Sequence, residues 1–188
     1  MAKRISLREF QQNLSMRLGS AQRGENSRAL LGVASGQGED SLWLFDLADS
    51  GEVAPLTTLT PAPLTKHWFA GLVNIRGALY SVVDFSALRG GEATPLNAEA
   101  RLLLIGTRHG INSALLVNRT LGLFAPDTLT LTDASSQKIP TADAAWRGKR
   151  YIDSAGTKWT RLRIPALLAD PAFLDVAETA TKNSGVSA

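Results

Sequence analysis

The sequence predicts a mainly β protein, built as small barrels or as a sandwich, and three observations lead to this fold class. Roughly eight to ten short apolar runs follow one another about ten residues apart, as strands do in small β domains. Glycine, asparagine and aspartate stand between these runs, where turns need them. Pro55, Pro61 and Pro63 oppose helix formation through residue 64. An α/β arrangement is therefore not expected.

Length and composition limit the kind of protein further. With 188 residues, 44% of them hydrophobic, the chain can bury a core as one domain or as two small subdomains. The absence of cysteine excludes disulfides, thiolate nucleophiles and cysteine zinc sites. The apolar runs are far shorter than the roughly 18 residues of a membrane span, and no signal-peptide core follows Lys3 and Arg4. We therefore expect a soluble cytoplasmic protein that is not inserted in a membrane.

The positive charge is concentrated in the leader. Residues 1–28 hold six Lys or Arg and two Glu, whereas the other 160 residues hold fourteen basic and fifteen acidic side chains. A nucleic-acid-binding domain usually carries a basic face on its folded body. The body of this chain has a net charge of −1, so nucleic acid is not expected as a partner.

The leader contains a predicted amphipathic helix. Ser6 and Glu9 form a capping box. Four apolar residues then lie on one helix face, at spacings of three and four: Leu7, Phe10, Leu14 and Leu18. Gly19 ends the helix and polar residues 20–27 form a linker. A helix of about three turns is marginal alone in water, so it must dock on its own body, on a partner or on another copy. A membrane surface fits less well because the apolar face is narrow.

The first strands of the body are predicted before residue 55. Leu30–Ala34 is a short strand, and residues 35–40 form a turn by composition. Leu42–Leu47 is apolar enough to be buried on both faces. The sequence Asp-Ser-Gly at 49–51 breaks this strand, and Glu52 and Val53 resume it.

A predicted hairpin over Trp68–Phe85 is the centre of the sequence. It consists of two apolar runs joined at Asn74, Arg76 and Gly77, where glycine permits the positive φ of a tight turn. Arg76 is the only charged residue between Lys66 and Asp84. It is either an ordinary solvated turn residue or a group presented for binding.

The second half predicts further strands and two short helical turns. The predicted strands are Arg101–Ile105, Ile111–Val117, Leu121–Phe124 continuing the same sheet, the alternating Thr128–Thr132, Tyr151–Ile152 and Trp159–Leu162. Residues 108–110 form a hairpin turn, and residues 135–149 are expected to be a loop. The helical turns are Pro165–Leu168 and Pro171–Leu174, the second with Asp170 as its N-cap. Residues 179–188 lack apolar anchors and should fray.

No arrangement typical of catalysis is found in the sequence. His67 and His109 have no metal-ligand spacing to another donor, and each is expected to be a satisfied surface histidine. The chain lacks a nucleophile elbow, a phosphate loop and a dinucleotide fingerprint. An enzyme would need carboxylates such as Asp46 and Asp84 in one cleft. A barrel that binds a small molecule would need an interior cavity, whereas the apolar strands favour a filled interior.

The central hairpin resembles a known signature. Gly71-Leu-Val-Asn-Ile-Arg-Gly77, followed by Val82-Val-Asp84, is similar to the signature of the CheW-like domain. The resemblance covers roughly residues 29–174 of the chain. Asn118 and Arg163 depart from the family pattern, which usually has aspartate at these positions.

Two further motifs resemble one branch of this family. Phe10-Gln-Gln12 in the leader and His67-Trp-Phe69 before the signature are similar to the PilI-like coupling proteins of type IV pilus chemosensory systems. The resemblance therefore implies a role in the control of twitching motility.

The resemblance implies a fold of two five-stranded SH3-like barrels that share a core. It implies an adaptor without catalytic residues, metal or cofactor, which couples the tips of methyl-accepting chemoreceptors to a CheA-type histidine kinase. It divides the chain into leader and linker (1–28), CheW-like domain (29–175) and flexible tail (176–188). The residues implied to make or shape partner contacts are Glu52, Gly71, Asn74, Arg76, Gly77 and Asp84.

Removal of residues 1–27 tests the division between leader and body. We expect the truncated chain to fold, because the body holds the apolar runs that form the core. A cooperative thermal transition, followed by circular dichroism beside the full chain, is the measurement. An unfolded product would show that the leader is part of the core.

Overall fold

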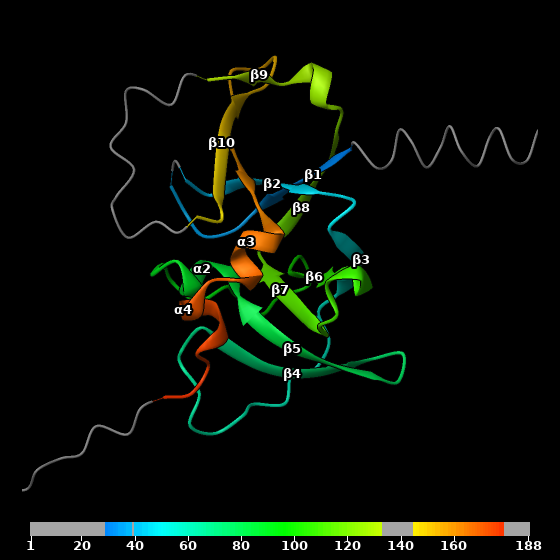
Figure 1. Ribbon diagram of the computed structural model, residues 1–188, viewed down its shortest axis with the longest axis vertical. Helices are drawn as coiled ribbons and strands as arrows, with labels where there is room; N and C mark the ends of the chain where they lie inside the picture. Colours follow the sequence, from blue (N-terminus) through cyan, green and yellow to red (C-terminus); the bar gives the residue numbers. More distant parts are fainter. Residues whose placement is uncertain (1–28, 39, 133–144, 179–188) are drawn as a thin grey trace, which may run out of the picture.

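A computed structural model of the protein describes residues 29–38, 40–132 and 145–178. These residues form two β-sheets, a six-stranded sheet in the upper half of Figure 1 and a five-stranded sheet in the lower half. Three short helices lie beside the region where the sheets meet (Figure 1). The predicted leader helix and the predicted fraying residues 179–188 lie outside the described residues. Within these ranges, no helix is long and apolar enough to cross a membrane.

The six-stranded sheet is antiparallel except where β2 lies parallel to β11. Its strands, in spatial order, are β8 (Arg119–Phe124), β1 (Leu30–Ala34), β2 (Leu42–Asp46), β11 (Lys158–Leu162), β10 (Arg147–Ile152) and β9 (Thr130–Leu131). The predicted last hairpin is confirmed as β10 and β11, which pair Tyr151 with Trp159.

The five-stranded sheet has one parallel pair, β5 with β7. Its spatial order is β3 (Ser50–Pro55), β6 (Arg101–Ile105), β7 (Ser113–Val117), β5 (Ala78–Asp84) and β4 (Phe69–Ile75). The chain passes between the two sheets from β2 to β3 and again from β7 to β8. The sequence predicted that residues 121–124 continue the sheet of the preceding strand. This prediction is wrong, because β8 joins the other sheet.

Short helical segments join or follow the strands. In the described ranges the α-helices are α2 (Phe85–Leu88), α3 (Ile164–Leu168) and α4 (Pro171–Leu174), and the 3-10 turns are η1 (Thr107–His109) and η2 (Pro126–Thr128). The predicted N-cap is confirmed, because the Asp170 carboxylate accepts from the amide of Ala172 at 2.8 Å. The alternating stretch 128–132 keeps only a two-residue strand, and residues 147–149 belong to β10 rather than to the expected loop.

The core has three parts because the central strands are buried on both faces. In β6, Leu103 and Ile105 face a core shared by the two sheets, whereas Leu102 and Leu104 face the interior of the five-stranded subdomain. In β2, Phe45 faces the shared core and Leu44 faces the interior of the six-stranded subdomain. Burial on both faces explains the continuous apolar runs of the sequence.

The predicted fold class is confirmed, with a correction in strand number. The protein is mainly β, with two barrel-like subdomains on a shared core. One sheet has six strands rather than the expected five, because two-residue β9 is added beyond β10. Among the described residues no ladder joins the two end strands of either sheet.

A backbone bridge partly closes the five-stranded subdomain. The segment after β3 returns to β4, where Thr60 and Leu72 exchange two hydrogen bonds of 2.8 Å. Gly71 makes this approach possible, since a Cβ there would lie 2.5 Å from the Thr60 carbonyl oxygen and its φ is +128°.

The described chain ends in a similar bridge. The Lys66 amide donates to the Val176 carbonyl, and the Glu178 amide donates to the Leu64 carbonyl, each at 2.9 Å. The Lys66 ammonium also lies 2.7 Å from the Asp175 carboxylate. Residues 176–178, assigned to the flexible tail from the sequence, thus pair with the body.

We expect Gly71→Ala to lower the free energy of unfolding by more than about 2 kcal/mol, because the new methyl group meets a backbone carbonyl. Gly77→Ala is the matched control. Its φ is also positive, at +85°, but a Cβ there meets nothing within 4 Å, so we expect a cost of about 1 kcal/mol. Urea denaturation of both variants is the measurement, and equal costs would contradict the closing role of Gly71.

Candidate functional site

The predicted turn between β4 and β5 is a two-residue loop. Arg76 and Gly77 stand between the paired residues Ile75 and Ala78, with φ values of +51° and +85°. Two consecutive positive φ values are typical of a type I′ turn, which matches the twist of a hairpin. The Asn74 side-chain oxygen accepts from the Gly77 amide at 2.9 Å. Asn74 and Gly77 therefore fix the backbone on which Arg76 is carried.

The Arg76 side chain is exposed to solvent and is oriented by an ion pair. It is 78% exposed, and its Nη2 donates to Oε1 of Glu52 at 2.9 Å. Glu52 lies in β3, at the opposite end of the sheet order from β4. Exposed ion pairs contribute about 0–1 kcal/mol to stability, and a non-glycine residue at positive φ is itself costly. This pair therefore orients the guanidinium more than it stabilises the fold.

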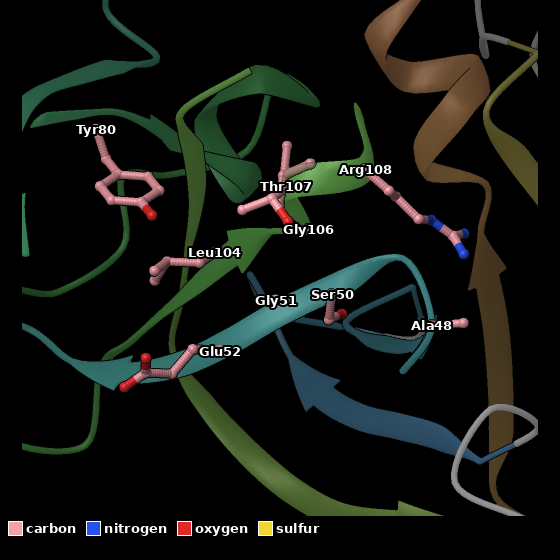
Figure 2. A pocket seen from close by; sticks show the side chains of 10 residues that line it. Ala48, Ser50, Gly51, Glu52, Tyr80, Leu104, Gly106, Thr107 and Arg108 are labelled. Carbon is pink, nitrogen blue, oxygen red and sulfur yellow. The ribbon is translucent and has the colours of Figure 1, made fainter. Parts of the chain in front are cut away.

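An open groove of about 400 Å³ lies beside this ion pair (Figure 2). Glu52, Tyr80 and Leu104 appear on one side of the view, and Ala48 and Arg108 on the other. The groove therefore carries an acidic side chain at one side and a basic side chain at the other, with Ser50, Gly51 and Thr107 between them. It is a surface feature, since the interior of the five-stranded subdomain is filled by apolar side chains: Ala54, Val73, Val82, Ala100, Leu102, Leu104, Ala114 and Leu116.

A buried carboxylate anchors the far side of the groove. Asp49, on the crossover from β2 to β3, accepts from the Arg108 guanidinium and lies 3.0 Å from Nε2 of His109. The His109 side chain is only 12% exposed. Burial, and next the Arg108 charge, lower the pKa of His109. His109 is satisfied, as predicted, but it is not on the surface, whereas His67 is exposed.

Asp84 is buried, with 4% exposure, and does not pair with Arg76. Its Oδ1 accepts from the amides of Ser86 and Ala87 at the start of α2 and from the Thr94 hydroxyl. Its Oδ2 accepts from the Thr94 amide at 2.6 Å. Asp84 therefore caps α2 and ties residue 94 to the start of this helix.

The six predicted residues thus fall into two groups. Glu52, Asn74, Arg76 and Gly77 meet at the tip of the β4–β5 hairpin. Gly71 and Asp84 lie further along the same two strands and hold backbone segments together.

Three nearby side chains were not predicted from the sequence. Tyr80 and Arg108 line the groove, and Leu79 is an exposed apolar residue two positions after the turn. The alternation of β5 could have placed Tyr80 on the face of Val82. Nothing local in the sequence could have brought Arg108 to Asp49, which is 59 residues away.

Comparison with known proteins agrees with this geometry. The model of the CheW-like domain matches residues 30–169. The chain belongs to the CheW-like domain family. It is 28% identical to Protein PilI of Pseudomonas aeruginosa over 134 residues, covering 70% of this chain and 71% of that protein. It is 36% identical to the chemotaxis protein CheW of Rhizobium meliloti over 97 residues, covering 50% of this chain and 56% of that protein.

A solved structure has the same fold. The crystal structure of the scaffolding protein CheW from Thermoanaerobacter tengcongensis superposes with a TM-score of 0.58 at 16% identity, covering 73% of this chain and 89% of that one. Family membership supports an adaptor role in chemosensory signalling and is consistent with a protein that is not an enzyme.

The carboxylates considered for catalysis do not share a cleft. Asp46 in the six-stranded sheet pairs with Arg161 at 2.6 Å, and Asp84 is enclosed in the other subdomain. In the described ranges no three metal-ligating residues gather at one place.

The lowered pKa of His109 predicts a pH dependence of stability. Its ordinary pKa is 6.5, and in the folded protein the pKa is lower. The unfolded chain therefore binds the proton first as pH falls. The stabilising contribution is complete above 6.5 and is lost as pH falls through the folded pKa.

His109→Gln should remove this component of the loss between about pH 7.5 and about pH 5.5, measured by urea denaturation. His67→Gln, at an exposed histidine, should keep it. An unchanged pH dependence in the His109 variant would refute the assignment.

Proposed function

We propose that this protein is a cytoplasmic adaptor that couples methyl-accepting chemoreceptors to a CheA-type histidine kinase. We further propose that it serves the chemosensory system of type IV pili and twitching motility. Similarity to Protein PilI over 70% of the chain supports the second statement. Membership of the CheW-like domain family supports the first.

One observation carries the proposal, namely the presentation of Arg76. Arg76 has a positive φ, which is unfavourable for a residue with a side chain, and its long charged side chain is 78% exposed. Strain at an exposed position without a packing role favours a binding function. Guanidinium offers five donors in a rigid fork, so it can keep the Glu52 contact and still bind a carboxylate or carbonyl of a partner.

The groove beside Arg76 gives the partner a second contact. Tyr80 offers a partly exposed aromatic ring, and Glu52 and Arg108 offer opposite charges. A partner that inserts an apolar side chain here would exclude water from the Glu52–Arg76 pair, which strengthens both charged contacts. In this arrangement Glu52 and Arg76 touch the partner, and Gly71, Asn74, Gly77 and Asp84 shape the surface.

Arg76→Glu tests this surface. We expect the variant to fold, because the side chain is exposed, and to lose about 2 kcal/mol of binding to the kinase or the receptor tip, roughly thirtyfold in Kd. Binding of the purified partners by calorimetry is the measurement. Lys158→Glu is the matched control, since Lys158 is an exposed cation on the other sheet. Unchanged binding of Arg76→Glu would count heavily against the proposal.

A double reversal separates contact from architecture. In Glu52→Arg with Arg76→Glu the ion pair can form again with its charges exchanged. If Arg76 touches the partner, binding stays weak in this variant. Full recovery of binding would show that the pair only shapes the surface.

A further inference from the structure

In the structure that is described, the two sheets end in four edge strands, and three of these strands are protected. An open edge with free backbone groups invites pairing with another chain, and proteins protect such edges with charge, proline, short length or a covering segment. In the described part of the chain, β3 carries Glu52 and ends at Pro55, and β9 has only two residues. Strand β4 is bridged by Thr60.

The fourth edge strand, β8, is interrupted once, at Leu121, where its register with β1 shifts. Within the described ranges, its last residues carry no charge, proline or covering segment. It has the sequence Arg-Thr-Leu-Gly-Leu-Phe, and among the described residues it pairs only with β1. Leu123 is 61% exposed, and a Cβ on Gly122 would meet nothing within 4 Å. The single charge, Arg119, stands at the end opposite Phe124.

The exposed leucine continues the apolar face of the core. Leu123 is the ladder partner of Leu31, and side chains of paired residues lie on the same face of a sheet. Leu31 belongs to the shared core. The same face of the sheet is therefore covered by the shared core at Leu31 in β1 but is exposed to solvent at Leu123 in β8.

The position of the leader points to what covers this edge. The described chain begins at Ala29, and its next residue, Leu30, pairs with Phe124 of β8. The leader carries the predicted amphipathic helix at 6–18, followed by ten residues up to Arg28. Ten residues span at most about 33–36 Å, so the helix can reach the whole length of β8.

We propose that the leader helix lies along β8 of the same molecule and covers it with its apolar face. The apolar side chains that meet Leu123 and Gly122 are Leu7, Phe10, Leu14 and Leu18. Charge favours the Phe124 end of the strand, because exposed Asp127 follows it and the leader is basic. A short tether gives an effective concentration in the millimolar range, so the leader outcompetes a second copy at micromolar protein.

Cross-linking of the full chain tests the contact. Because the chain contains no cysteine, only the introduced cysteines can react. The variant Leu14→Cys with Leu123→Cys is treated with a short bismaleimide. We expect fast cross-linking within the monomer, at a rate that does not depend on protein concentration. Gln12→Cys with Leu123→Cys, from the opposite helix face, and Leu14→Cys with Leu96→Cys, at another exposed leucine, should react at least about tenfold more slowly.

Three results would overturn the proposal. Cross-linked dimers that increase with protein concentration would assign the edge to a second copy. Equal rates in all three variants would show a leader without a docking site. If the helix is docked, trypsin should cleave after Arg17 about tenfold more slowly in the control Leu96→Asn than in Leu123→Asn. Equal cleavage rates in the two variants would show that Leu123 does not hold the helix.

Discussion

The packing of strands between two apolar environments is the constraint on which the rest of this structure depends. Neighbouring residues of β6 alternate between the shared core and the interior of one subdomain, and β7 alternates in the same way. Each central strand therefore belongs to two cores at once, and a polar residue at any of these positions would be buried. The two subdomains are thus one packed unit rather than independent modules.

The crossovers between the sheets turn this unit into a rigid support. At the β2–β3 crossover the Asp49 carbonyl accepts from the Gly106 amide at 2.9 Å, and its carboxylate holds Arg108 and His109. The shared core also holds an aromatic contact from β2 to α2, Trp43 against Phe85 at 5.0 Å. The β4–β5 hairpin is joined to this unit by the pairing of β5 with β7. A turn held in one orientation loses less entropy on binding.

The site is consistent with an adaptor because its charged groups lie on an open surface of the five-stranded subdomain. Its charged groups, Glu52 and Arg76, form an exposed ion pair, and the attraction between them would become stronger if a bound protein excluded water. The edge strand β8 belongs to the other sheet. A leader that covers it would leave the hairpin and its groove free for partners.

Local features of the sequence determined much of this protein. The apolar runs fixed most strands, the order Asn74-Ile-Arg-Gly77 fixed the turn, and Asp170 fixed a helix start, because each depends on residues within a few positions of one another. Only the tertiary structure decided that β8 leaves the sheet of β7, that Glu52 holds Arg76 over 24 residues and that Asp84 binds Thr94. No local period encodes such pairs, since they depend on how strands distant in the chain pack on a common core.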